Sequence, residues 1–193
     1  MKGPNHKTSL VMQGYAATRG SLKLLEDPEV YEGRFRGSYL DEARETLKED
    51  ISANDALSGT FLNAGYKPRG KAESPEGKAC GNEDAWPDHL PIVFKADGKE
   101  GVLNLLYRIS QELGTGLEAD LFAIPVRQST IELCECADIN PYLLDSEGVF
   151  IAVTDDEDGF TERFGGVTIG KLRNDNQKFV RIGERVSFLS PGD

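Results

Sequence analysis

The stretch Val149-Phe150-Ile151-Ala152-Val153 is the segment that most constrains the fold. Strand side chains alternate between the two faces of a sheet, so a strand that is apolar at every position is covered on both faces. This segment therefore predicts the central strand of a sheet. Its five residues are far fewer than the roughly 18–20 that a membrane-spanning helix needs, and we expect no membrane association.

The segments around this strand predict the rest of a sheet. We expect further strands at residues 91–94, 121–126, 129–137, 160–164, 167–172 and 179–188. Between the first two, residues 102–113 have a broad apolar helical face that ends at Gly114, a typical C-cap residue. Strands that follow one another without alternating helices favour an antiparallel sheet. The predicted fold is α+β, a mostly antiparallel sheet with one long packed helix in the C-terminal half.

The N-terminal residues have a different pattern. Residues 1–37 follow neither the helix nor the strand period, which favours an irregular, extended arm. Ser38 and Asp41 have the spacing of a capping box, so we expect a short helix from Ser38 to about Asp50. Residues 65–91 are rich in proline and glycine, as connectors are. The sequence thus predicts three units: an arm and short helix at 1–64, an irregular connector at 65–91 and an α+β domain at 92–193.

The charge balance argues against nucleic-acid binding. The 193 residues include 22 Lys plus Arg against 33 Asp plus Glu, a formal net charge of −11. Proteins that bind nucleic acid directly need a basic surface, so we expect no such partner. The N-terminus lacks the continuous apolar run of a secretory signal. Three cysteines cannot all pair within one chain, so we expect free thiols and a cytoplasmic location.

Carboxylates gather in two parts of the sequence. Residues 155–158 are four consecutive acidic residues directly after the central strand, and two glutamates lie in the predicted strand at 129–137. Clustered carboxylate oxygens are ligands for hard divalent cations, and such a cation can activate water. We favour a solvent-exposed turn for the acidic run, with a divalent-cation site as the alternative. The candidate metal ligands are Glu132, Glu135, Asp155, Asp156 and Asp158, and apart from that alternative we expect no cofactor.

The cysteines give a weaker signal. Cys134 and Cys136 stand one residue apart, and Cys80 and His89 are the available residues to complete a four-ligand zinc site. Zinc sites usually have two residues between paired cysteines, so we favour buried structural thiols. The sequence contains no nucleophile elbow, P-loop or dinucleotide-binding fingerprint.

Four aromatic residues are the candidate partner-binding residues, because their neighbours are mostly polar: Tyr15, Tyr31, Phe35 and Trp86. The alternative is that they pack on their own domain. With an arm, an acidic body and no catalytic motif, we favour a non-enzymatic interaction or assembly module. It would be a subunit of a larger complex, a virion component or an acidic inhibitor of a basic partner, and it would bind another protein or copies of itself. The alternative function is a divalent-metal-dependent hydrolase or nuclease that uses the clustered carboxylates.

Overall fold

The computed structural model describes residues 8–31, 33–70 and 91–190, and these contain five α-helices. The helices are α1 (Thr18–Leu24), α2 (Gly37–Asn63), α3 (Val102–Leu113), α4 (Gln128–Ala137) and α5 (Glu157–Phe164). Within the described ranges, none of the helices is both long enough and apolar enough to cross a membrane.

Seven strands form one sheet in the order β2-β4-β1-β5-β3-β6-β7. The strands are β1 (Ser9–Gln13), β2 (Ile92–Lys95), β3 (Gly116–Asp120), β4 (Phe150–Thr154), β5 (Val167–Arg173), β6 (Lys178–Ile182) and β7 (Arg185–Phe188). Neighbouring strands are antiparallel except β3 and β6, which are parallel. This arrangement confirms the α+β class and the mostly antiparallel sheet.

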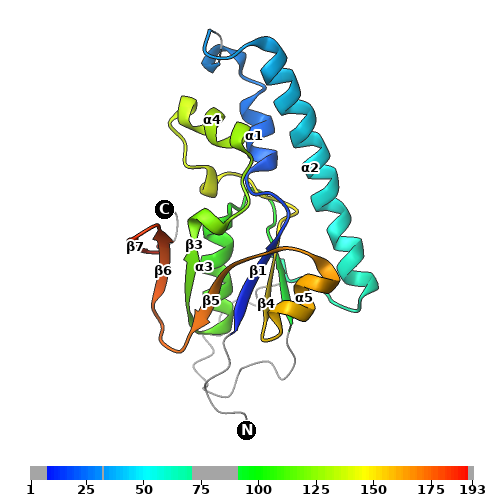
Figure 1. Ribbon diagram of the computed structural model, residues 1–193, viewed down its shortest axis with the longest axis vertical. Helices are drawn as coiled ribbons and strands as arrows, with labels where there is room; N and C mark the ends of the chain where they lie inside the picture. The colour runs from blue at the N-terminus through cyan, green and yellow to red at the C-terminus, as the bar shows by residue number, and fades with distance from the viewer. Residues whose placement is uncertain (1–7, 32, 71–90, 191–193) are drawn as a thin grey trace.

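Strand β1 shows that the predicted N-terminal arm is wrong. It lies in the middle of the sheet, between β4 and β5 (Figure 1). Leu10, Val11 and Met12 are fully buried, with Leu10 and Met12 on one face and Val11 on the other. The opening segment is therefore part of the same body as the residues after position 91.

The polar ends of β1 explain why its sequence did not predict a strand. Ser9 and Gln13 flank a short apolar run, and both side chains are buried. The Ser9 hydroxyl donates to Glu157 at 2.6 Å, and the Gln13 amide donates to the Phe164 carbonyl at 2.7 Å. These partners lie about 150 positions away in the sequence, where no local pattern reveals them.

Several predicted elements are corrected by the structure. The longest helix is α2, so the longest helix is not in the C-terminal half. The predicted strands at 129–137 and 160–164 are the helices α4 and α5, and β3 precedes the strand expected at 121–126. In α4, the buried residues Thr130, Leu133 and Cys134 have helical spacing, so the alternation in this segment was coincidental. The predicted connector at 65–91 falls mostly on residues 71–90, outside the described ranges.

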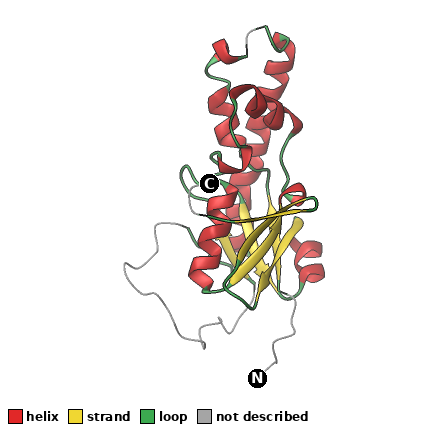
Figure 2. Ribbon diagram, turned by 90° about the vertical axis from the view of Figure 1, so that its left-hand side faces the viewer, coloured by secondary structure: helices red, strands yellow, loops and turns green. Residues whose placement is uncertain are grey.

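The sheet is covered differently on its two faces (Figure 2). Helix α3 covers one face with a core that spans all strands from β2 to β6. We call the opposite side the outer face. The end of α2 and helix α5 cover the outer face only over β2, β4 and β1, where Val11, Val93 and Ala152 meet Phe61 and Phe160.

A third apolar cluster holds the helices that lie beyond one end of the sheet (Figure 1). We call α1, α4 and the N-terminal half of α2 the helical lobe. Its buried residues are Leu25, Tyr31, Ala43, Leu47 and Leu133. The lobe and the sheet are thus two separately packed regions joined through α2 and through the three loops that connect β1 to α1, β3 to α4 and α4 to β4.

Candidate functional site

The outer face of β3, β5 and β6 carries charged side chains where the neighbouring strands carry apolar ones. Leu117 and Ala119 lie in the core under α3, so Glu118 and Asp120 point to the outer face. Lys171 of β5 stands opposite Glu118 in register, and Arg181 of β6 stands beside Asp120. The sheet register therefore brings these charges to one surface.

Strands β3, β5 and β6 line an open hollow of about 310 Å³, which we call the sheet hollow. A Cβ on Gly170 would lie 2.2 Å from the carbonyl oxygen of Glu118, so only glycine allows β5 to approach β3 this closely. The lining residues are Glu118, Ala119, Asp120, Ala123, Thr168, Ile169, Gly170, Lys171 and Arg181.

Glu118 is the centre of the charges in the hollow. Its carboxylate accepts a hydrogen bond from Arg181, lies 3.3 Å from the Arg173 guanidinium and lies 3.9 Å from the Lys171 ammonium. The Arg181 hydrogen bond, together with the nearby Lys171 charge, lowers the pKa of Glu118 below its ordinary value. The Glu118 side chain is 16% exposed, whereas those of Lys171 and Arg181 are 49% and 47% exposed. The cations thus stay open to solvent while the carboxylate is covered.

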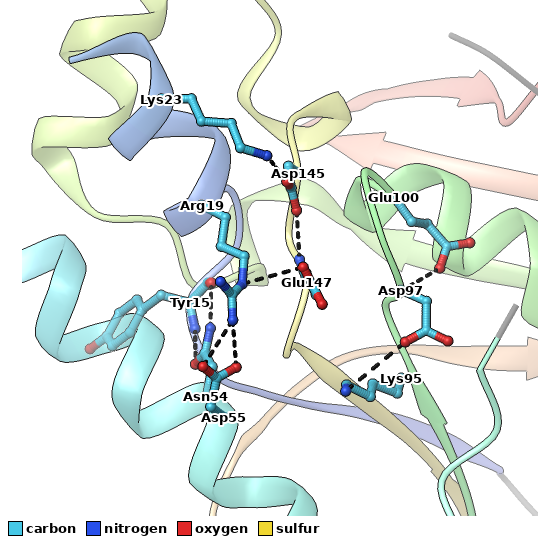
Figure 3. Close-up of polar contacts among 10 residues, drawn as sticks. All are labelled: Tyr15, Arg19, Lys23, Asn54, Asp55, Lys95, Asp97, Glu100, Asp145 and Glu147. Atoms are coloured by element: carbon cyan, nitrogen blue, oxygen red, sulfur yellow. Dashed lines mark hydrogen bonds and ion pairs between the residues drawn. The ribbon is translucent and has the colours of Figure 1, made fainter. Parts of the chain in front are cut away.

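A second polar group, the polar junction, joins the helical lobe to the sheet (Figure 3). The buried Asn54 side chain accepts from the Tyr15 N–H at 3.4 Å and donates to the Tyr15 carbonyl at 3.3 Å. Arg19 binds both carboxylate oxygens of Asp55 at 2.8 Å and lies 3.5 Å from Glu147. Since these contacts link α1, α2 and the loops beside the sheet, we interpret the junction as a structural connection between the two regions.

The loop before α3 is also held by polar contacts (Figure 3). Glu100 is buried and accepts two hydrogen bonds from Arg108, at 3.0 and 3.1 Å, and one from the Asp97 N–H at 3.3 Å. Arg108 also donates to the Lys95 carbonyl at 2.7 Å. These contacts fix the path from β2 into α3.

The predicted metal ligands do not come together. Glu132 and Glu135 lie on α4 in the helical lobe, whereas the acidic run lies at the start of α5 beside the sheet (Figure 1). Glu132 accepts hydrogen bonds from Tyr39 and Gln128, and Asp156 caps α5 by accepting from the Gly159 N–H at 3.0 Å. In the part of the chain that the structure describes, no three His, Cys, Asp or Glu side chains are placed to share a metal ion.

The described aromatic candidates pack on their own chain. The Arg127 guanidinium lies over the Tyr15 ring, 3.8 Å from the ring centroid. Arg127 also donates two hydrogen bonds to the carboxylate of the buried Asp50, at 2.7 and 2.6 Å. Tyr31 is buried in the lobe core, and its ring lies 6.4 Å from that of Phe35. Trp86 lies outside the described residues. A role for these four residues in binding a partner stays a prediction.

The cysteines show no ligand arrangement. Cys134 is buried and Cys136 is half-buried, and both thiols are free. Burial raises the pKa of Cys134 to about 11. A thiol of this kind is a poor nucleophile at neutral pH. Cys80 and His89, the other candidate ligands, lie outside the described residues.

The sheet hollow was not predicted from the sequence. The signal for it was the presence of cations on short strands: Lys171 and Arg173 alternate in β5, and Arg181 lies in β6. That signal identifies an exposed face. It does not show that Glu118 and Arg181, 63 positions apart, meet on it.

The sequence matches no protein-family model and no curated protein. Solved structures do share its fold. Crystal structures of the hydrogenase maturation protein HypE match with TM-scores of 0.59 for the E. coli protein and 0.57 for a second structure, each at 13% identity. The two matches cover 99% and 96% of this chain, and they cover 52% and 53% of the respective HypE chains. The Aquifex aeolicus thiamine monophosphate kinase ThiL, complexed with AMPPCP and TMP, matches with a TM-score of 0.52 at 14% identity, over 95% of this chain and 51% of that one.

These findings correct the function predicted from the sequence. The interaction or assembly module depended on an N-terminal arm, and β1 instead lies within the sheet. The fold is instead shared with HypE and with ThiL in its complex with AMPPCP and TMP, and this finding contradicts the non-enzymatic module. The alternative of a metal-dependent hydrolase or nuclease is wrong as well, because the carboxylates that it required lie on separate elements. The chain spans about half the length of the structures that it matches.

Proposed function

We propose that this chain is a domain of an ATP-using enzyme. The observation that carries the proposal is the shared fold with ThiL, because that structure holds AMPPCP, an ATP analogue with a non-hydrolysable β–γ linkage, together with TMP. A fold by itself does not specify a function, so the chain must also offer a site. Its open, charged cavity of about 310 Å³ is at the lower end of small-molecule pockets.

The size of that cavity bears on how much of the nucleotide this chain contacts. Small-molecule sites commonly lie between domains, where two surfaces enclose the ligand. Since this chain corresponds to about half of each similar structure, a second domain would supply the remaining contacts. We therefore expect this chain to contact only part of the nucleotide.

Thermal unfolding with and without AMPPCP tests the proposal. A ligand that binds only the folded state stabilises it by about 2.7 kcal/mol at about 100 times its Kd. For a domain of this size, that corresponds to a rise in Tm of about 5–10 °C. We expect a saturable rise with AMPPCP and none with adenosine alone at the same concentration. An unchanged Tm at millimolar AMPPCP, together with no heat of binding by titration calorimetry, would overturn the proposal.

A further inference from the structure

The cations of the sheet hollow have more hydrogen-bond donors than its carboxylates use. Lys171, Arg173 and Arg181 together carry about a dozen N–H donors, and one carboxylate has about four lone-pair positions. Asp175 takes two of the Arg173 donors, at 2.9 and 2.6 Å. Glu118 contacts all three cations with its two oxygens. The half-exposed ends of Lys171 and Arg181 therefore keep donor capacity directed toward solvent.

The electrostatic setting of the hollow differs from that of the whole chain. The chain has a formal net charge of −11, which repels anions at long range. Around the hollow, the three cations are balanced by three carboxylates, Glu118, Asp120 and Asp175. Asp120 also accepts a hydrogen bond from the Phe122 N–H at 3.0 Å. An anion in the hollow thus meets exposed donors without a local excess of negative charge.

The cations are also held in place before any ligand arrives. All three side chains project from paired strands, and strands position functional groups more accurately than loops do. Glu118 stays ionised at neutral pH and orients the guanidinium groups of Arg173 and Arg181. The Arg173 guanidinium lies 5.0 Å from the centroid of the Phe179 ring, which restricts it further. A preorganised set of donors loses little conformational entropy when an anion binds.

Lys171 on β5 and Arg181 on β6 lie on either side of β3, and two cations so placed match an anion with more than one charged group. Guanidinium and ammonium groups are the usual protein donors to phosphate oxygens. We propose that the sheet hollow binds the phosphate chain of a nucleoside triphosphate, with Lys171 and Arg181 as the phosphate-binding residues and Glu118 as the residue that positions them. The choice of a nucleotide as ligand rests on the proposed function.

Titration calorimetry with pyrophosphate and with AMPPCP tests this assignment on the full chain. Lys171→Gln and Arg181→Gln each remove one charged donor from a half-exposed side chain, so circular dichroism should show both variants folded. We expect each variant to bind both ligands about tenfold more weakly, as for the loss of one charge-assisted hydrogen bond. Lys48→Gln is the matched control: Lys48 is exposed in the helical lobe and pairs with Glu45 at 2.8 Å. It should leave both affinities unchanged.

Glu118→Gln separates a positioning role from simple charge attraction. If Glu118 only competes with phosphate for the cations, its removal should strengthen pyrophosphate binding several-fold. If it positions them, the variant should gain little or lose affinity despite having one negative charge fewer, and this is the result that we expect. A clear gain in affinity would overturn the positioning role.

The two proposals fail in distinguishable ways. If AMPPCP binds the wild type and both hollow variants equally, the hollow is not the phosphate site, and the ATP-using function stands. If pyrophosphate binds in the hollow but AMPPCP does not bind more tightly than pyrophosphate, the phosphate site stands and the nucleotide assignment is wrong. If neither ligand binds the wild type, both proposals are wrong.

Discussion

The two halves of the outer face differ in what their strands present. Over β2, β4 and β1, the outward residues of the core are apolar, such as Val11, Phe150 and Ala152, and α2 and α5 pack on them. Over β3, β5 and β6, most outward residues are charged or polar, including Glu118 and Lys171, and a hollow opens there. We call these the covered half and the open half. The inner face is apolar under both halves, so the two halves differ in their outward residues.

The largest effect is expected in the covered half. Phe61 is fully buried, and its ring lies 5.1 Å from that of Phe150 and 5.4 Å from that of Phe164. Phe61→Ala should lower the free energy of unfolding by about 3–5 kcal/mol, since it leaves a cavity between α2 and the sheet. The control is the next residue, Leu62, which is 58% exposed and whose change to Ala should cost less than about 0.5 kcal/mol. If urea denaturation showed equal losses of unfolding free energy for the two variants, α2 would not pack on the covered half through Phe61.

A smaller effect is expected at the boundary between the halves. Glu157, at the start of α5, accepts hydrogen bonds from the Ser9 hydroxyl at 2.6 Å and from the Thr168 hydroxyl at 2.7 Å. Glu157→Ala removes both contacts and should cost about 1–3 kcal/mol. Glu162→Ala, on the exposed side of the same helix, should cost less than about 0.5 kcal/mol. Chemical denaturation of the two variants compares them, and equal costs would contradict the boundary role of Glu157.

In the open half, the expected effect depends on pH. Hydrogen bonding from Arg181 keeps the folded-state pKa of Glu118 below its ordinary value, so its ionised form stabilises the fold above the unfolded pKa. That stability is lost as the pH falls through the folded-state pKa. Wild type should therefore be more stable than Glu118→Gln at pH 7, and the difference should shrink in acid below that pKa. Denaturation of both proteins across this range checks the prediction, and a difference that stays constant would contradict it.

The smallest effect is expected at the edge of the open half. Val186 on β7 is 55% exposed, so Val186→Thr should change the free energy of unfolding by less than about 0.5 kcal/mol. Val11→Thr makes the same change at a fully buried position of the covered half and should cost about 1–3 kcal/mol. If both substitutions have the same effect, the two halves do not differ in the way described above.

The sequence was sufficient for the elements whose patterns are unbroken. Strand β4 is apolar at every position except its last, and α3 is apolar along a wide face, so both were predicted. Strand β1 was missed because Ser9 and Gln13 interrupt its pattern with polar groups that find partners only in the folded protein. The segment of α4 alternates by chance, and only packing against the lobe core distinguishes it from a strand.

The candidate site was harder to predict for a related reason. Glu118, Lys171 and Arg181 come from three strands far apart in the sequence, and their meeting depends on the register of β3 with both neighbours. The parallel pairing of β3 with β6 is a departure from the antiparallel sheet that the strand run favoured. Composition and local spacing carry no information on that pairing.

Mapping AMPPCP binding by NMR on the full chain tests the central claim most directly. The account predicts that backbone amide shifts change at residues 117–120, 168–173 and 178–182, around the sheet hollow, with smaller changes in the covered half. Shift changes centred on Arg19 and Asn54 at the polar junction, or no changes at millimolar AMPPCP, would contradict it.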